Sequence, residues 1–216
     1  MNRWDVFGQY SPREHERLTA QSFNRYVDNS GNGFWTPGCR HWALRRLQTA
    51  NTGQDTWSAF KSEVHFNRAG GNETAEQRDA ARRASRVAYE EYISSELAKF
   101  HAALSGQKKK RKKPDCAGAL DALGKVTHSW QDFFAHAVHE TRGFSGSPYP
   151  FPNTPWNPGR YWPSSWPGEH PLRAEPVPAG TPEYAARYDA AVDFVWFRYL
   201  ETLSIWIELC WCECGQ

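Results

Sequence analysis

One run of the chain concentrates side chains that could do chemistry: His128-Ser-Trp-Gln-Asp132-Phe-Phe-Ala-His136-Ala-Val-His139-Glu140. An α-helix turns about 100° per residue, so positions along the run convert to angles around one axis. With His128 at zero, His139, Asp132 and His136 fall at about 20°, 40° and 80°, and Glu140 at about 120°. The spacing predicts one helix face with three imidazoles and a carboxylate, and Glu140 at its margin.

This face has the composition of a metal site. Neutral imidazole and carboxylate are ligands that zinc takes in catalytic sites. The run spans about 16 Å along the helix axis, which is too long for one ion and suits two or three ions bridged by Asp132. The alternative is that the histidines are hydrogen-bonded core residues. Three histidines and an aspartate on one stripe, in a chain with eight histidines, favour the metal site.

Helix signals dominate the segments that would position this face. Ser11-Pro12-Arg13-Glu14 is a capping box that predicts a helix to about residue 27, and a second box at Thr74–Gln77 predicts one over 75–104. Asp115 can cap the site-bearing helix, which we expect to reach Glu140. Further helices are predicted over 41–48, from Asp55 or Thr56 to 65, and over 181–210. We therefore expect an all-α single domain, 1–216, of about five to seven helices around a metal cluster.

Two connecting segments have distinctive compositions. Residues 106–114 contain the basic run Lys108–Lys113, which is typical of a solvated linker, with a phosphate-contacting loop as the alternative. Residues 143–180 hold most of the prolines, interleaved with tryptophans. Because proline disrupts regular structure, this segment is predicted to be a long ordered loop, neither regular helix nor central strand. Its rings would cover the core or form an interfacial lid.

The last predicted helix, 181–210, carries a continuous apolar stripe that should pack against the site-bearing helix. Glu201 within it is either a late carboxylate ligand facing the metal cleft or an ion-paired surface residue. Cys210, Cys212 and Cys214 form a C-x-C-x-C tail that lacks the usual zinc-site spacing, so a buried or terminal thiol cluster is predicted. Five cysteines leave at least one thiol free or paired between chains.

Composition excludes several classes of protein. An aromatic share of 15%, with 11 tryptophans, argues against disorder. The mean hydropathy of −0.77 and the absence of a sufficiently long apolar window argue against a membrane span. The formal charge of +2 gives no global reason to expect nucleic acid or an anionic membrane as partner. The N-terminal sequence has no apolar stretch of the kind that a secretory signal peptide carries.

The run Leu123–His136 resembles the "LG-x-x-x-H-x-x-Q-D-F-x-A-H" signature of the fungal heterokaryon-incompatibility C family. Related patterns occur in bacterial zinc-dependent phospholipases C and, more remotely, in zinc-dependent single-strand nucleases. Toxin domains at the C-termini of bacterial Rhs-type effectors carry similar runs. Glu14–Thr19 resembles the family's "H-x-x-(L/I)-T" helix, and Val64–Asn67 its "HFD" segment. The resemblance covers about residues 11–140 and has no counterpart over 143–216.

The resemblance implies an α-helical fold that holds one to three zinc ions and hydrolyses phosphodiesters. It implies three ligand sets: His65, His128, Asp132 and Asp55 for one ion, His15 and Asp132 for a second, and His136 with His139 or Glu140 for a third. Asp132 would thus be the central carboxylate. If Asp55 is not a ligand, it would orient or deprotonate the attacking water, or simply cap a helix.

We therefore expect a zinc-dependent, phospholipase C-like phosphodiesterase that is delivered into target cells as an antibacterial toxin within a larger secreted effector. Its expected partners are a phospholipid or other phosphodiester substrate, a membrane surface and a cognate immunity protein. The alternatives are a metal-dependent nuclease toxin, for which the basic run would steer phosphates, and a non-enzymatic membrane-perturbing domain. The sequence does not separate lipid from nucleic acid, because both are phosphodiesters.

Overall fold

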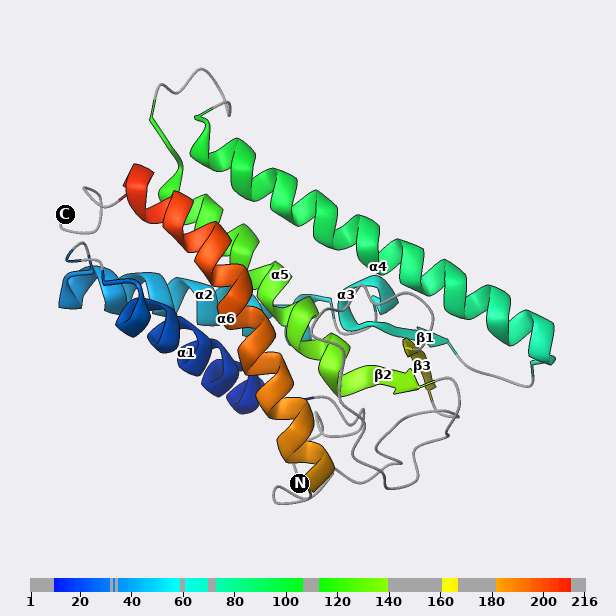
Figure 1. Cartoon of the computed structure of the whole chain (residues 1–216). Coiled ribbons are helices and arrows are strands. Elements are labelled where there is room, and N and C mark those ends of the chain that lie inside the picture. The colour runs from blue at the N-terminus through cyan, green and yellow to red at the C-terminus, as the bar shows by residue number, and fades with distance from the viewer. Residues whose placement is uncertain are drawn as a thin grey trace.

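The site-bearing helix α5 (Cys116–His136) runs through the middle of the fold. In the computed structural model it contacts four long helices: α1 (Pro12–Asn29), α2 (Pro37–Trp57), α4 (Ala75–Leu104) and α6 (Pro182–Cys210). Figure 1 shows α4 along one flank of α5, and α1, α2 and α6 on the other. The one-turn helix α3 (Ser62–His65) lies between α4 and α5. The structure describes residues 10–31, 33, 35–58, 61–69, 73–106, 113–139, 161–166 and 182–210, and within them the fold is all-α, as predicted, apart from three short strands.

The predicted helix starts are confirmed at three caps. Ser11 and Glu14 form the reciprocal capping box of α1, with the Ser11 amide donating to Glu14 Oε2 at 2.7 Å. Thr74 forms the equivalent box for α4. The Asp115 carboxylate accepts from the Gly118 amide at 2.9 Å at the start of α5. These bonds occupy backbone donors that a helix start leaves without intrahelical partners, so each fixes where its helix begins.

α2 differs from the prediction. It is one continuous helix that begins after Thr36, which caps it, and ends at Trp57. The predicted separate helix starting at Asp55 or Thr56 is wrong, because both residues lie in the last turn of α2. Packing against α5 stabilises this polar stretch, which has little helical preference of its own. The packing is close: a Cβ on Gly124 of α5 would lie 2.6 Å from the Leu47 carbonyl oxygen.

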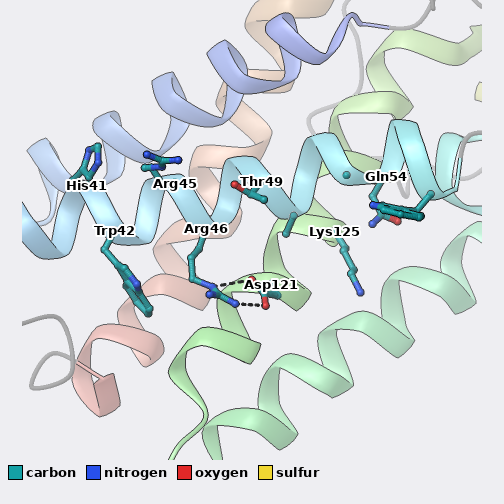
Figure 2. A pocket seen from close by; sticks show the side chains of 11 residues that line it. His41, Trp42, Arg45, Arg46, Thr49, Gln54, Asp121 and Lys125 are labelled. Carbon is teal, nitrogen blue, oxygen red and sulfur yellow. Dashed lines mark hydrogen bonds and ion pairs between the residues drawn. The ribbon is translucent and has the colours of Figure 1, made fainter. Parts of the chain in front are cut away.

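An ion pair fixes the register of the same two helices. Arg46 of α2 donates to both carboxylate oxygens of Asp121 of α5 (Figure 2). The pair is partly exposed, so it contributes more to alignment than to the free energy of unfolding.

The other end of α5 also differs from the prediction, because the helix stops at His136 instead of Glu140. The next residues form strand β2 (Ala137–His139), which joins β1 (Asn67–Ala69) and β3 (Tyr161–Trp166) in a sheet of order β1-β3-β2. β3 is central, so the prediction of no central strand within 143–180 is wrong for 161–166. β2 pairs with residues 161–163 and β1 with 164–166. Pro163 therefore has a strand partner on one side only, where its missing N–H is tolerated. The rest of 143–180 lies outside the described residues, as does the basic run apart from Lys113.

α6 packs against α5, as predicted, and also against α1. The buried residues along its apolar stripe are Ala191, Val195, Tyr199, Leu203 and Ile207. Glu201 is exposed and pairs with Arg198 at 2.7 Å, so the hypothesis that it is a metal ligand is wrong. The predicted thiol cluster is wrong for Cys210, which forms a disulfide with Cys116. Cys39 is disulfide-bonded as well. Cys212 and Cys214 lie outside the described residues. No described helix is both long and apolar enough to span a membrane.

Candidate metal centre

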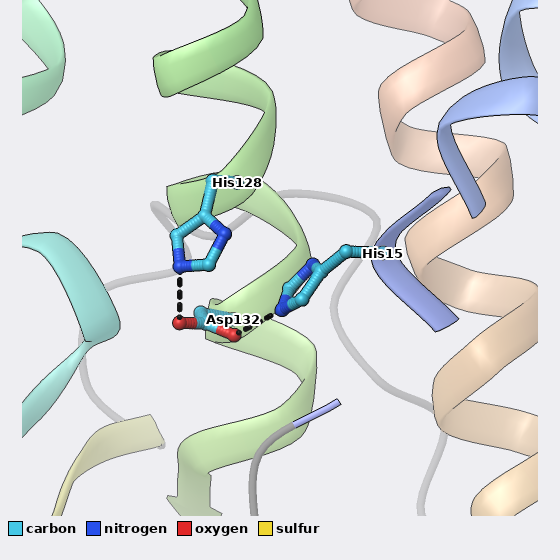
Figure 3. Close-up of side chains that lie close together, drawn as sticks. All are labelled: His15, His128 and Asp132. Carbon is cyan, nitrogen blue, oxygen red and sulfur yellow. Dashed lines mark ion pairs between the residues drawn. The ribbon is translucent and has the colours of Figure 1, made fainter. Parts of the chain in front are cut away.

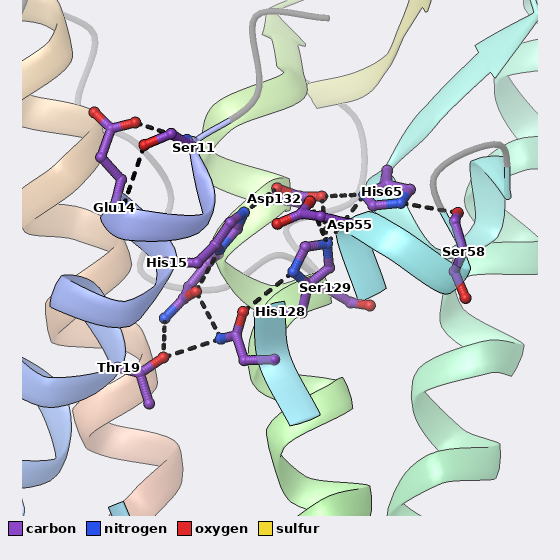
Figure 4. A network of polar contacts seen from close by, with 12 residues as sticks. Ser11, Glu14, His15, Thr19, Asp55, Ser58, His65, His128, Ser129 and Asp132 are labelled. Carbon is purple, nitrogen blue, oxygen red and sulfur yellow. Dashed lines mark hydrogen bonds and ion pairs between the residues drawn. The ribbon is translucent and has the colours of Figure 1, made fainter. Parts of the chain in front are cut away.

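Four helices bring five predicted site residues together around one point (Figure 4). His15 comes from the first turns of α1, Asp55 from the last turn of α2 and His65 from the end of α3. His128 and Asp132 lie one turn apart on α5. The three histidines and Asp132 have no exposed surface, and Asp55 is 9% exposed. Residues that are far apart in sequence thus form one buried polar cluster.

Asp132 lies at the centre of the cluster and has a histidine on each side. Its Oδ1 lies 3.2 Å from His15 Nε2, while its Oδ2 lies 2.6 Å from His65 Nδ1 and 3.1 Å from His128 Nε2. Figure 3 shows His15 and His128 approaching the carboxylate from different helices. The two oxygens therefore face two separate nitrogen sets.

On the Oδ2 side, three ligand-type atoms form a triangle. The nitrogens of His65 and His128 lie 3.0 Å apart, and Asp55 Oδ1 lies 3.7 Å from His128 Nε2. A single proton can form a hydrogen bond between two of these three atoms, and the third atom then has no donor. A tetrahedral zinc ion with bonds of about 2.0–2.1 Å holds its ligand atoms about 3.3 Å apart, which is close to the spacings observed.

The outer nitrogen of His65 reveals the tautomer of its ring. His65 Nε2 lies 3.0 Å from the Ser58 carbonyl oxygen. A carbonyl oxygen only accepts, so Nε2 carries the proton of the neutral ring and Nδ1 presents its lone pair to Asp132 and His128. Metal-bound histidines in proteins are held in this way by a carbonyl or carboxylate behind the ring.

His128 and His15 are held by side-chain amides in the same manner. His128 Nδ1 donates to Asn51 Oδ1 at 3.2 Å, and His15 Nδ1 donates to Gln131 Oε1 at 2.6 Å. The amide orientations follow from Thr19, whose hydroxyl oxygen accepts from both amide nitrogens at 2.9 and 3.1 Å. In their neutral forms, all three histidines would therefore direct an unprotonated nitrogen at the same carboxylate, as metal binding requires.

Several buried polar atoms here are incompletely satisfied. Both carboxylate oxygens of Asp55 have no hydrogen-bond partner, and His15 Nε2 and Asp132 Oδ1 have only their 3.2 Å contact with each other. Burying such atoms without partners is costly, and native proteins seldom leave several together. Two groups have their ligand atoms within 4.8 Å of one another: His15, His128 and Asp132, and Asp55, His65 and His128. The donor set fits a metal ion, which would complete the coordination of these atoms.

Burial and the charges within the cluster shift the pKa values of its histidines and of Asp132. Burial opposes the charged form of His15, but the carboxylates of Asp55 and Asp132 outweigh burial and raise its pKa to about 9. For His65, too, burial is outweighed by Asp132 and Asp55, so its pKa is raised. Burial dominates for His128 and lowers its pKa. Burial would raise the pKa of Asp132, but the histidines hold it well below its usual range. The cluster thus attracts cationic charge.

A left-handed residue holds His65 in place. Phe66 has φ 48° and ψ 42°, which is strained for an aromatic residue. Its ring is buried against Tyr89 and Phe133, with centroids 4.8 and 4.7 Å away. This packing offsets the backbone strain and ends α3 directly after the ligand candidate.

The remaining predicted ligands are not brought into this cluster by the described residues. His136 is buried at the last residue of α5 and belongs to neither group of three. The predicted four-ligand helix face is wrong at His139, because the helix ends first and His139 lies in β2. The His139 side chain and Glu140 lie outside the described residues. A third ion therefore stays a prediction.

Sequence reasoning missed the residues that hold the ligands. No sequence pattern identifies Asn51, Ser58, Thr19 and Gln131, although Gln131 lies inside the run Leu123–His136 that carries the family resemblance. Their roles depend on helix packing and on side-chain orientation. Comparisons with protein-family models, curated proteins and solved structures find no match to this chain.

Proposed function

We propose that this protein is a zinc-dependent phosphodiester hydrolase that acts on phospholipid. The observation that supports it best is the arrangement of His15, His65 and His128. Each ring has its outer N–H bound to a protein oxygen and its other nitrogen directed at Asp132. A cluster that served stability alone would gain from fewer buried ionisable groups.

The donor set favours zinc over the harder cations. Magnesium and calcium prefer cages of oxygen atoms, whereas three imidazoles with two carboxylates suit zinc and its neighbours in the transition series. Because the two oxygens of Asp132 face different nitrogens, this carboxylate fits the role of a bridge between two ions. His65, His128 and Asp55 would complete one site, and His15 would contribute to the other.

The proposed chemistry assigns a role to each carboxylate. Zinc supplies Lewis-acid chemistry, lowering the pKa of bound water and neutralising phosphoryl oxygens. Asp132, wholly buried, positions the ligand nitrogens of three helices. Asp55 is the most exposed member of the cluster, and neither of its oxygens has a hydrogen-bond partner. It is therefore placed either to complete the metal site or to take the proton of the attacking water.

Two further points favour phospholipid and delivery outside the producing cell. Disulfides persist in oxidising compartments, and Cys116, Cys210 and Cys39 are all disulfide-bonded. The run Leu123–His136 resembles the corresponding runs of phospholipases C and of Rhs-type toxin domains. Together they support a delivered toxin acting on membranes of the target cell, with an immunity protein as its expected partner.

Zinc-loaded protein incubated with phosphatidylcholine and phosphatidylglycerol vesicles, and separately with single- and double-stranded DNA, tests this function. We expect release of the phosphorylated head group, abolished by chelation and restored by zinc. DNA cleavage without lipid hydrolysis would replace the proposal with the nuclease. Vesicle leakage without release of head groups would support the membrane-perturbing alternative.

A further inference from the structure

A groove of about 580 Å³ lies along the outer face of α2, away from the ligands of the metal cluster. Thr49, Ala50 and Gly53 are the small residues among its lining, with Asp121 and Lys125 of α5 on one flank. Figure 2 shows Trp42 and Arg46 on the side of α2 that faces α5, and His41 and Arg45 on the other. The metal site does not use this surface.

The groove carries positive charge that its own acid does not neutralise. Asp121 is fully engaged, because both of its oxygens accept from Arg46. Neither Arg45 nor Lys125 has an ion-pair partner among the described residues, and both line the groove. Two cations thus remain available to an anionic ligand.

Two tryptophans, 15 residues or about 22 Å apart on α2, line the groove near its ends and differ in their surroundings. Trp42 is partly buried and stacks on Trp206 of α6 with ring centroids 6.0 Å apart. Trp57 is 84% exposed, more than any other large apolar side chain among the described residues. Indole rings are amphipathic and are enriched where proteins meet the lipid head groups.

Trp57 lies next to the part of the metal cluster that reaches the surface. Asp55, the most exposed cluster residue, precedes it by two positions, which is about 3 Å along the helix axis. Two positions also turn the side chain to the other side of the helix, so Asp55 faces the cluster while Trp57 faces outward. A ligand surface bound through Trp57 would thus lie beside the candidate metal site.

We propose that this face of α2 docks on an anionic lipid surface, with Trp57 in the head-group layer and Arg45 and Lys125 against lipid phosphates. This docking surface rests on the proposed function, because it is the face with which a phospholipid hydrolase would bind the membrane that contains its substrate. The unpaired Arg45 and Lys125 and the exposed ring of Trp57 suit a charged membrane surface, where each basic side chain adds to the free energy of binding. A groove for single-stranded nucleic acid needs cations along its length and successive rings on which bases stack.

Sedimentation of metal-free protein with vesicles tests the docking without turnover. We expect binding to phosphatidylglycerol vesicles to exceed binding to phosphatidylcholine vesicles and to weaken at high salt. W57A should weaken it several-fold, and the double variant R45A/K125A roughly tenfold or more. F197A is the matched control, because Phe197 of α6 is also a surface aromatic, 53% exposed, and lies outside the groove.

Trp57 and Arg45 are exposed and Lys125 is only partly buried, so all variants should keep the melting temperature of the wild type. Equal binding by wild type and W57A, or equal losses in W57A and F197A, would overturn the docking surface. Retardation of single-stranded DNA by this face without vesicle binding would also overturn it. Hydrolysis of a soluble phosphodiester by zinc-loaded wild type tests the enzyme separately, so vesicle binding that depends on Trp57 without any hydrolysis would retain the docking surface and reject the enzyme.

Discussion

Asp121 and Asp132 lie eleven residues apart on one stripe of α5, about 20° from each other around the helix, and have opposite surroundings. Asp121 is partly exposed, and a single arginine fills both of its oxygens. Asp132 is fully buried among three histidines, and its Oδ1 has only the 3.2 Å contact with His15 Nε2. The first pair is complete as it stands and aligns two helices. The second belongs to a cluster that a metal ion would complete, and this difference makes it the candidate metal site.

The largest expected effect separates these two aspartates. D132N should lower the rate of the proposed phosphodiester hydrolysis about 100- to 1,000-fold or more, because a neutral amide is a poor substitute for the carboxylate that would hold the metal. D121N should change the rate little and the free energy of unfolding by about 1 kcal/mol or less, since the Arg46 pair is solvent-screened. Steady-state kinetics with a soluble phosphodiester measure both. Similar rates in D132N and the wild type would remove the distinction.

The sequence predicted the candidate ligands better than the residues that hydrogen-bond to them. The spacing of His128 and Asp132 needs only helical geometry, and the caps at Ser11, Thr74 and Asp115 are local signals, so these predictions are confirmed. The end of α5 depends on pairing with β3, 25 residues further along the chain, and local spacing does not reveal such pairing. The positions of Asn51 and Gln131 behind the rings likewise depend on how α1, α2 and α5 pack.

The next effect concerns the covalent tie at the Asp121 end of α5. Cys116 and Cys210 are 94 residues apart, so their disulfide closes a long loop. The double variant C116A/C210A should lose about 2–5 kcal/mol of the free energy of unfolding, measured by urea denaturation. Cys116 lies about 18 Å along α5 from His128, so the folded variant should still bind zinc. Unchanged stability, or zinc binding lost while the fold is kept, would contradict this separation of the two ends.

A smaller effect concerns pH in the metal-free protein. The pKa of His15 is raised from 6.5 to about 9 in the fold, and that of His65 is also raised. Their stabilising contribution is complete below pH 6.5 and is lost as pH rises through about 9. The lowered pKa of His128 affects stability only below pH 6.5, so it does not offset the loss of stability between pH 6.5 and about 9.

With chelator present, the free energy of unfolding should therefore fall by about 1–3 kcal/mol between pH 6.5 and 9. Zinc requires neutral imidazoles, so the loaded protein should not show this decline. Urea denaturation at both pH values, with and without chelator, measures it. A flat profile with chelator would mean that the cluster does not hold a proton in place of a metal.

The most direct test is zinc stoichiometry, determined by elemental analysis and isothermal titration of the wild type, D132N and D121N under identical conditions. We expect at least one tightly bound zinc per chain in the wild type and in D121N, and none in D132N. Less than one bound metal per chain in the wild type, or the same zinc content in D132N as in D121N, would contradict the metal centre.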